Sequence, residues 1–510
     1  MTFPALAVVV AAVIATALAD LRWLRVAQRE HYLAGSATRF ALRWWVRLGP
    51  NRVLAAAAVL GVVLSPVSPF TALAGVAAVA VGPFRLSLLG RSPGRLRWTP
   101  RLRTVSAVTV GAQAAVVVGG IALGAAVPVA AAVALLAPLA VDGALAVLGP
   151  VEDHKADRFV RQATARLAQV APTVVGITGS FGKTTTKAYA AHLMRGARTV
   201  VPTPASFNNR AGLSRAINEG LVPGTEVFIA EMGTYGPGEI AELVEWCPPR
   251  VAAITAIGPV HLERFGDEDA IVRAKSEIFT HAEVAVLNVD DPRLAGLAPE
   301  GCRVVRCSAT DPGADVCACV TGGRLVVRRS GSAIADVPAP EAAAENVAVA
   351  VALALSVDVP VTVVASALAT LPSVPNRRDL TTLSTGATAI DDTFNSNPAG
   401  CRAALATLAR SAVDGHLRVV VTPGMVELGP RQAPENAAFA ALAAAAVTHV
   451  VIVGFTNRAA LLAGVQEVRS EERAQVLVAD THDRAVDWVR ANTGPGDVVL
   501  YENQLPDHYP

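Results

Sequence analysis

The sequence predicts a helical, membrane-spanning N-terminal region followed by two α/β domains, a central one with a mainly parallel sheet and a smaller, Rossmann-like one. The chain of 510 residues has room for about three domains. Hydrophobic residues make up 52% of it and the mean hydropathy is +0.43, which is too high for a wholly soluble protein. From residue 151 onward, short β-branched runs alternate with helical segments, as they do in α/β units.

The N-terminal third has the composition of membrane helices. No Asp or Glu occurs between His31 and Val141. A helix needs about 20 apolar residues to cross the hydrocarbon core, and segments 3–19, 105–123 and 127–148 are each near that length. Segment 53–82 is interrupted by prolines and is interpreted as two short spans, with a re-entrant pair or a buried hairpin of a soluble domain as alternatives. We therefore expect about five transmembrane helices within residues 1–150.

The arginines predict the orientation of these helices. Two connectors, 20–52 and 85–103, carry seven and six arginines, whereas the turns near 65–69 and 124–128 carry no charge. Arginine-rich connectors stay in the cytoplasm. An outside N-terminus and five crossings then place everything after Pro150 in the cytoplasm, so we expect a multi-pass protein of the cell membrane.

The remaining two thirds predict two α/β domains, over 151–372 and 376–510. Strands are expected at 173–178, 226–231, 251–257 and 283–288, and three β-type runs within 303–329 suggest an antiparallel addition. Pro372, Pro375 and Asn376 mark a linker. Five further strands, at 387–391, 417–421, 449–453, 476–478 and 497–501, alternate with helices.

Charge and cysteine usage exclude some functions. A net charge of +2 gives no support for a nucleic-acid partner. The six cysteines do not have the spacing of a zinc site, and we expect them to be reduced, as in a cytoplasmic protein. The alternative is that Cys317 and Cys319 bind a metal. The cysteines are Cys247, Cys302, Cys307, Cys317, Cys319 and Cys401.

The segment Gly176-Ile-Thr-Gly-Ser-Phe-Gly-Lys-Thr-Thr-Thr186 predicts a phosphate-binding loop, because it follows a β-type run and opens a helix. Backbone N–H groups of such a loop and of the helix N-terminus surround phosphate oxygens. Lys183 would reach the outer phosphates of ATP, and the Thr184 hydroxyl would face Mg²⁺. The central domain is therefore predicted to be a P-loop ATPase domain, with nucleotide contacts from Gly179, Ser180, Gly182, Lys183, Thr184 and Thr185.

This loop resembles that of the Mur ligases, which build the stem peptide of peptidoglycan and share their plan with folylpolyglutamate synthases. Further segments resemble, in order, motifs of the branch that adds D-alanyl-D-alanine. They are 203–212, 231–240, 257–263 and 274–278, followed by 391–398 and 424–429 in the last domain. The resemblance covers roughly residues 160–500.

The resemblance implies a catalytic and metal site. Glu231, His261 and Lys275, together with Thr184, would hold two Mg²⁺ ions, and Lys275 would be carbamylated, which converts a cation into a carboxylate-like ligand. Lys183, Glu231, His261 and Lys275 would be the catalytic residues. The structural alternatives are a solvated carboxylate for Glu231, a packed loop residue for His261 and a surface lysine for Lys275.

The same resemblance implies the nucleotide and substrate contacts. Asn208 and Asn209 would lie near the substrate, although loop-capping asparagines are an alternative interpretation. Asn346 would contact adenine. Arg377 and Asp392, or their neighbours Arg378 and Asp391, would bind nucleotide phosphate and ribose once the last domain closes on ATP.

Three features depart from the family pattern. Ala342 and Ala343 replace a His-Asn pair before Asn346, and the segment 501–510 replaces a basic Gly-Ser ending. Membrane spans stand where soluble members bind the UDP of their substrate. We therefore expect a lipid-linked or membrane-delivered carboxylate substrate, whose local concentration the anchor raises.

The sequence thus predicts an ATP-dependent amide ligase of envelope peptide synthesis at the bacterial cell membrane. It would activate the carboxylate of an envelope precursor as an acyl phosphate and join it to an amino acid or dipeptide. Its expected partners are ATP, Mg²⁺, that precursor, the amine and membrane lipid, with no nucleic acid. A poly-γ-glutamate-type polymer synthase and a non-catalytic membrane scaffold are the alternatives.

Overall fold

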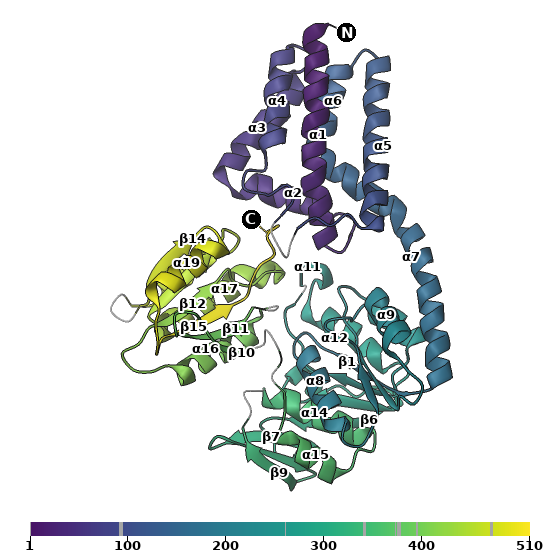
Figure 1. Cartoon of the computed structure of the whole chain (residues 1–510), viewed down its shortest axis with the longest axis vertical. Coiled ribbons are helices and arrows are strands. Elements are labelled where there is room, and N and C mark those ends of the chain that lie inside the picture. Colours follow the sequence, from purple (N-terminus) through teal and green to yellow (C-terminus); the bar gives the residue numbers. More distant parts are fainter. Residues whose placement is uncertain are drawn as a thin grey trace. The chain divides into compact units, whose positions relative to one another are not determined.

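The computed structural model describes residues 2–90, 95–260, 262–339, 343–372, 374, 379–393, 396–469 and 473–509. The chain forms two compact units (Figure 1). The first, here called the helical unit, is Met1–Lys155 together with Leu505–Pro510, and the second is Ala156–Gln504. His261, Arg377 and Arg378 lie outside the described residues, and so does Ala342.

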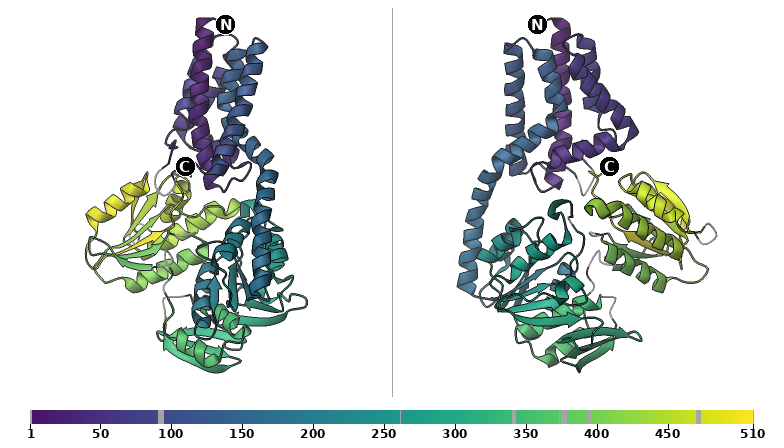
Figure 2. Two further views of the ribbon diagram at one scale, coloured as in Figure 1. Left: turned by 45° about the vertical axis from the view of Figure 1, so that its right-hand side comes forward. Right: turned by 180° about the vertical axis from the view of Figure 1, so that it is seen from behind.

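The helical unit is a bundle with an Ala-rich interior. α1 packs against α4 and α6, and α5 packs against α6 (Figure 2). The buried cluster includes Trp23, Phe40 and Leu102, while many aliphatic side chains such as Val13 and Val118 are exposed. The helices are α1 (Phe3–Arg29), α2 (Ser36–Arg47), α3 (Gly49–Leu64), α4 (Pro69–Val81), α5 (Pro100–Ala122), α6 (Ala126–Leu135) and α7 (Ala137–Val170).

Two of the described helices, α1 and α5, are long and apolar enough to span a membrane. The number of candidate spans rises to four if each of two sharply bent helix pairs counts as one span. The two pairs are α2 with α3, bent by 112°, and α6 with α7, bent by 71°. The single helix expected over 127–148 is therefore wrong. Pro138 explains the bend, because it has no N–H to donate to the carbonyl of Ala134 and fits only a first helical turn.

The expected pair within 53–82 is present as the hairpin of α3 and α4. Gly61 and Gly75 let the two backbones approach closely, since a Cβ on Gly61 would lie 2.5 Å from the Cα of Gly75. α4 has only 13 residues, about 20 Å of helix, which is less than the ~30 Å of a hydrocarbon core. Within the described residues, α3 and α4 are thus shorter than a full span, in agreement with the interpretation of this segment as two short spans.

The central part of the second unit contains a nine-stranded sheet in the order β2-β3-β1-β4-β5-β6-β7-β8-β9. Strands β2 through β7 pair in parallel with one another, and β8 pairs antiparallel with both β7 and β9. The antiparallel addition expected within 303–329 is present where β7 pairs with β8, whereas the first run, β6, pairs in parallel with both neighbours, and β9 was not expected. The strands are β1 (Thr173–Thr178), β2 (Val200–Pro202), β3 (Val227–Glu231), β4 (Val251–Ile254), β5 (Val284–Asn288), β6 (Arg303–Ser308), β7 (Val316–Thr321), β8 (Arg324–Arg329) and β9 (Ser332–Pro338).

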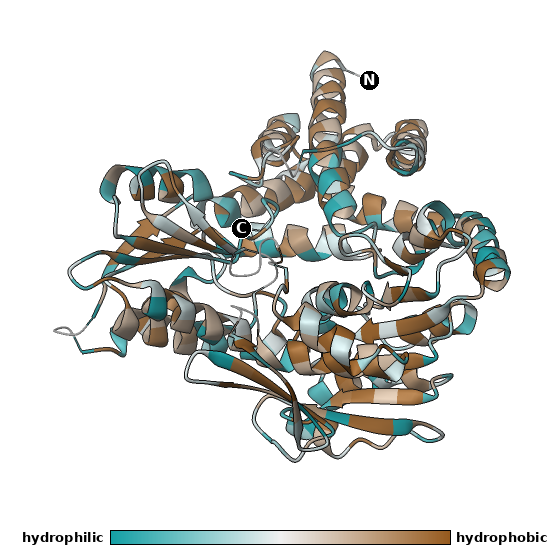
Figure 3. Cartoon of the chain, turned by 60° about the horizontal axis from the view of Figure 1, so that its bottom comes forward, coloured by the Kyte–Doolittle hydropathy of each residue, from teal (hydrophilic) through white to brown (hydrophobic). Residues whose placement is uncertain are grey.

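Helices cover both faces of this sheet, so its inner strands β1, β3, β4 and β5 are apolar along most of their length (Figure 3). Along β1, Val175 and Ile177 belong to one core and Val174 to the other. One face carries α8 (Lys183–Met194), α14 (Ala344–Ser356) and α15 (Val361–Leu368). The other carries the end of α7 with α9 (Arg210–Gly220), α10 (Glu239–Trp246) and α12 (Glu268–Ser276).

The C-terminal part contains a six-stranded sheet in the order β10-β11-β15-β12-β13-β14, parallel except for β10. This is the Rossmann-like arrangement predicted from the sequence. Its strands are β10 (Asp379–Thr382), β11 (Thr388–Asp392), β12 (Arg418–Thr422), β13 (His449–Val453), β14 (Gln475–Ala479) and β15 (Val498–Glu502). Its helices are α16 (Pro398–Ser411), α17 (Gln432–Ala446), α18 (Arg458–Gln466) and α19 (His482–Asn492).

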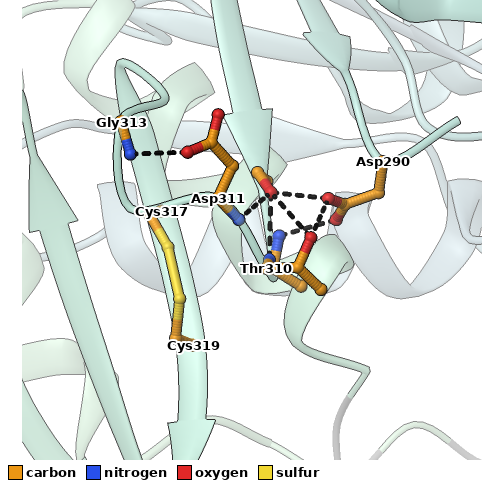
Figure 4. Close-up of a disulfide and its surroundings, with 8 residues drawn as sticks. Asp290, Thr310, Asp311, Gly313, Cys317 and Cys319 are labelled. Atoms are coloured by element: carbon orange, nitrogen blue, oxygen red, sulfur yellow. Dashed lines mark hydrogen bonds between the residues drawn. A yellow bond between two sulfur atoms is a disulfide. The ribbon is translucent and has the colours of Figure 1, made fainter. Parts of the chain in front are cut away.

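Cys317 and Cys319 form a disulfide along β7, which corrects the expectation that all six cysteines are reduced (Figure 4). Residues two apart in a strand point to the same face, so the two sulfur atoms can meet across Ala318. Joined sulfurs are not available as metal thiolates. The four remaining cysteines are free, as expected.

Beside the disulfide, the Asp290 carboxylate accepts hydrogen bonds from the hydroxyls of Ser308 and Thr310.

Glu502 is a fully buried carboxylate at the end of β15. It accepts hydrogen bonds from the hydroxyls of Ser396 and Thr422 and from the thiol of Cys401. Burial nevertheless raises the pKa of Glu502 from 4.5 to about 7, with a smaller contribution from Asp392. The folded C-terminal part therefore binds a proton at Glu502 in a pH range where the unfolded chain has lost it.

This carboxylate predicts a pH-dependent stability. The contribution of Glu502 is fully present below about pH 4.5 and is lost as the pH rises through about 7, a loss of roughly 3 kcal/mol for this change in pKa. Hydrogen exchange of β15 in the full chain should therefore accelerate between these pH values more than chemical exchange alone explains. Glu502→Gln should abolish that excess, and the exposed Glu467→Gln should not. An equal pH response in both variants would contradict the assignment.

Candidate active site

The loop between β1 and α8 has the geometry of an anion site. Gly179 and Gly182 have positive φ values of 150° and 78°. A Cβ on Gly182 would lie 2.3 Å from the Asn346 Oδ1 atom, so only glycine fits there. Gly182 is the N-cap of α8 and makes no side-chain hydrogen bond to the helix. The N-terminus of α8 is therefore suited to binding an anion through backbone N–H groups. Lys183 Nζ donates to the Gly179 carbonyl across the loop at 2.7 Å.

Glu231 is the centre of the site. It ends β3, the neighbour of β1, with Glu231 opposite Ile177 in the parallel register. The carboxyl ends of both strands therefore meet beside the loop. One carboxylate oxygen accepts from Lys187 Nζ at 2.8 Å and from the Thr184 hydroxyl at 3.0 Å, and the other accepts from the Asn208 amide at 3.2 Å.

The surroundings of Glu231 keep its carboxylate charged although the side chain is only 1% exposed. Burial opposes ionisation, but the charges of Lys187 and Lys183 and the hydrogen bonds from Lys187 and Asn208 outweigh it. The pKa of Glu231 consequently lies below its ordinary value. A buried, ionised carboxylate next to a phosphate loop is a suitable ligand for Mg²⁺.

Lys187 is a residue of the site that the sequence reasoning missed. It lies one helical turn after Thr184 on α8, and besides Glu231 its ammonium group donates to the Ala205 carbonyl at 2.5 Å. One signal could have revealed it. Of the 44 basic residues in the chain only four are lysines, and three of these, Lys183, Lys187 and Lys275, lie in this site.

The two asparagines of the loop before α9 have different roles. Asn208 contacts Glu231 through its side chain, and its carbonyl accepts from the N–H of Gly233 at 2.7 Å. Asn209 is the N-cap of α9, where its side chain accepts from Gly212 N. The structure thus places Asn208 in the site and gives Asn209 the capping role considered as the alternative.

Lys275 lies in the last turn of α12 and is 4% exposed. Burial and, to a lesser degree, the nearby charge of Lys183 lower the pKa of Lys275 well below its ordinary value. The interpretation of Lys275 as a surface lysine is therefore wrong, because the packing of α12 against the sheet encloses the side chain.

Ser180 connects the loop to the segment that precedes residue 261. Its N–H donates to the Ala256 carbonyl, and its hydroxyl hydrogen-bonds with both N and O of Gly258. Ser180 therefore positions the 256–260 segment beside the loop.

The remaining nucleotide candidates lie on several elements. Thr185 is in the first turn of α8, and Asn346, in the first turn of α14, accepts a hydrogen bond from the Thr186 hydroxyl at 3.3 Å. Asp391 caps its own turn by accepting from Thr393. Because Asp391 is engaged within its own turn, its neighbour Asp392, at the end of β11, is the better candidate for contacting the nucleotide.

The donor set fits ATP with Mg²⁺. Among the described residues no group of three or more His, Cys, Asp or Glu side chains could hold a metal. Thr184 and Glu231 would offer two oxygen ligands, and Mg²⁺ in nucleotide sites commonly takes only one or two protein ligands, with phosphate oxygens and water as the others. The glycine loop, Lys183 and the start of α8 supply the complementary phosphate contacts.

Two family models match this chain, the Mur ligase middle domain over residues 177–354 and the Mur ligase glutamate ligase domain over residues 376–501. The chain belongs to the Mur ligase family. The UDP-N-acetylmuramoyl-tripeptide–D-alanyl-D-alanine ligase of Mycobacterium bovis is 33% identical over 379 residues, which are 66% of this chain and 72% of that one.

Solved Mur ligase structures agree. MurF from Acinetobacter baumannii is 25% identical with a TM-score of 0.60, covering 69% of this chain and 78% of that one. MurF from Thermotoga maritima in complex with ADP is 26% identical with a TM-score of 0.58, covering 68% and 80%. The resemblance and fold class predicted from the sequence are therefore confirmed.

As a Mur ligase, the protein is an ATP-dependent peptide ligase of peptidoglycan synthesis. Both family models begin after residue 176, so neither includes the apolar helices of the helical unit. That region is additional to the two matched domains.

Lys187 should be needed for Mg²⁺ binding as well as for stability. Lys187→Met leaves Glu231 without its ammonium partner, so the amine-dependent release of ADP should fall roughly 10-fold to 100-fold, with a higher Mg²⁺ requirement. Lys155→Met, which removes the fourth lysine of the chain from an exposed position, is the matched control. An unchanged Mg²⁺ dependence in a folded Lys187→Met protein would show that Lys187 is only structural.

Proposed function

We propose that this Mur ligase joins the carboxylate of an envelope peptide precursor to D-alanyl-D-alanine, or to a single amino acid, at the cytoplasmic face of the membrane. The observation that carries the proposal is the Glu231 carboxylate, held by Lys187, Thr184 and Asn208 beside the phosphate loop. The relatives at 33% identity that add D-alanyl-D-alanine support the choice of amine.

The reaction proceeds in two steps. A carboxylate oxygen of the precursor attacks the γ-phosphorus of ATP, the bond to the bridging oxygen breaks, and ADP leaves. The amine nitrogen then attacks the acyl carbon, phosphate leaves, and the nitrogen gives up a proton. Both steps bring anions together, which requires the cations Lys183 and Mg²⁺.

Each residue of the site has a role in this scheme. Lys183 and the loop bind the outer phosphates, and Thr184 with Glu231 holds the first Mg²⁺, which neutralises phosphate charge when bound. Lys275, once carbamylated, and His261 would hold a second Mg²⁺. Asn208 contacts the precursor, while Asn209 shapes the substrate loop by capping α9. Asn346, Arg377 and Asp392 bind the nucleotide when the C-terminal domain closes and excludes water from the acyl phosphate.

Carbamylation of Lys275 is supported by its burial. Burial lowers the pKa of Lys275 and so favours its neutral amine, the form that adds to CO₂ with loss of a proton. The resulting carbamate carries a negative charge close to Lys183 and presents oxygens to a metal.

The carbamate can be tested on the full chain. Lys275→Ala should lose nearly all ligase activity, and short carboxylic acids should restore part of it by replacing the missing anion. Depletion of CO₂ should lower the activity of the unsubstituted protein and leave Lys275→Ala unchanged. Activity that is insensitive to CO₂, together with no rescue by carboxylic acids, would show that Lys275 acts as an unmodified amine.

The helical unit supports a membrane location. α1 and α5 are long and apolar enough to span, and the arginines at the C-terminal end of α1 correspond to a cytoplasmic end. Because these helices stand in place of a UDP-binding domain, we propose that the precursor is linked to a lipid carrier.

Precursor and amine can be varied together. ADP release should be highest with a lipid-linked muramoyl tripeptide and D-alanyl-D-alanine, lower with the UDP-linked tripeptide, and absent in Lys183→Ala. Turnover of the UDP-linked form alone would contradict lipid delivery. Preference for glutamate would favour a polymer synthase, and no amine-stimulated ADP release with any pair would favour a scaffold.

A further inference from the structure

Hydrogen-bonding atoms that are buried without a partner gather at one end of the helical unit. Nine of the thirteen such side-chain atoms in the described part of the chain lie around the C-terminal end of α1. Buried polar atoms in proteins are nearly always satisfied, and a cluster of unsatisfied ones indicates a missing ligand. They are Arg22 Nε, Arg25 Nε and Nη2, Arg29 Nε, Ser36 Oγ, Thr38 Oγ1, Arg39 Nε, Arg101 Nε and His508 Nδ1.

Arg25 is the most buried member of this cluster, with a side chain that is 0% exposed. Its Nη1 atom donates to an Asp507 carboxylate oxygen at 2.7 Å, whereas Nε and Nη2 have no partner among the described residues. A guanidinium group presents its donors as a planar fork that suits two oxygens of one anion. In Arg25, the Nε and Nη2 donors on one side of this group remain available for such an anion.

The C-terminal tail, residues 505–509, covers these arginines. The His508 ring hydrogen-bonds with Glu30 at 2.9 Å, and its carbonyl accepts from the indole of Trp44 at 2.9 Å. The Phe40 ring packs edge-on against His508 and Tyr509, at centroid distances of 4.8 and 5.0 Å. His508 is 1% exposed, so the donors beneath the tail become accessible only when the tail moves.

The charges under the tail favour an additional anion. Burial lowers the pKa of His508, Glu30 opposes this shift, and Arg29 and Arg25 reinforce it, so His508 is neutral at neutral pH. Arg39 pairs with Glu30, and Asp507 pairs with Arg25, while Arg29 has no ion pair among the described residues.

We infer that this end of the helical unit is a phosphate-binding site, formed by Arg25 and Arg29 and closed by the C-terminal tail. The Asp507 carboxylate takes the place that a phosphate oxygen occupies when the site is filled. A phosphate group offers enough oxygens for the unused donors of Arg25 and for Arg29. The group belongs to a lipid headgroup or to a soluble phosphate, which share this chemistry.

Filling the site requires the tail to move, because the tail covers the unused donors of Arg25 and its Asp507 carboxylate holds the Nη1 donor of the same guanidinium group. Only Asn503 and Gln504 separate the tail from β15, the strand next to Asp392 in the C-terminal sheet. Phosphate binding therefore releases the tail, the segment that follows that strand, from the rest of the helical unit. This site is independent of the ligase reaction, and its test measures binding and not turnover.

The test uses the full chain in detergent with a fluorescent short-chain phosphatidic acid, followed by fluorescence anisotropy. Arg25→Gln should weaken binding roughly tenfold or more, because it removes a charge-assisted contact. Asp507→Asn should strengthen binding by removing the competing carboxylate. Arg95→Gln, at an exposed arginine of the same unit, should change it less than about twofold. Arg29→Gln keeps the pair of Arg25 with Asp507 and serves if Arg25→Gln does not fold.

Hydrogen exchange of the tail completes the experiment. In nanodiscs of phosphatidylcholine, adding phosphatidic acid should increase exchange in the tail of the unsubstituted protein. Competition of inorganic phosphate with the lipid in the anisotropy assay would identify a soluble phosphate as a ligand, and its absence would identify the headgroup. Equal binding by the unsubstituted protein, Arg25→Gln and Arg29→Gln, or a tail insensitive to both phosphate sources, would overturn the proposal.

Discussion

The buried ion pair of Lys187 with Glu231 is the interaction on which the active site depends. It joins the helix after the phosphate loop to the end of the neighbouring strand, and the same carboxylate also accepts from Thr184 and Asn208. Removing one partner of a buried pair leaves an uncompensated charge, which costs about 3–5 kcal/mol. The phosphate loop, β3 and the loop that carries Asn208 are thus joined by one carboxylate.

Local sequence patterns were sufficient to predict the fold and, within the site, the phosphate loop and the position of Glu231 beside it. A β-type run, glycines and a Gly-Lys-Thr sequence identify a loop whose geometry depends on near neighbours. Glu231 could be placed because strand ends of a parallel sheet meet at one edge. The membrane interpretation also follows from composition, but the bend at Pro138 shows that a long apolar run does not ensure one straight helix.

Features that depend on distant contacts could not be predicted. Lys187 lies within an ordinary helix, and its role emerges only from the acceptors around it. Whether Asn209 binds substrate or caps a helix depends on the backbone of Gly212. The docking of His508 on Trp44 joins residues 464 positions apart, and the pairing of Cys317 with Cys319 requires knowing that residues 317 and 319 share a strand.

α7 is a single helix of 34 residues, and its second half packs through Ala163 and Leu167 against α9. Starting a helix is unfavourable, whereas extending one is easy. Because the N-terminal part of a chain emerges first during synthesis, the apolar first half of α7 is already helical when residues 156–170 follow. The helical unit thereby supplies the nucleus from which the first helix of the second unit grows, so the two units fold in succession along one continuous helix.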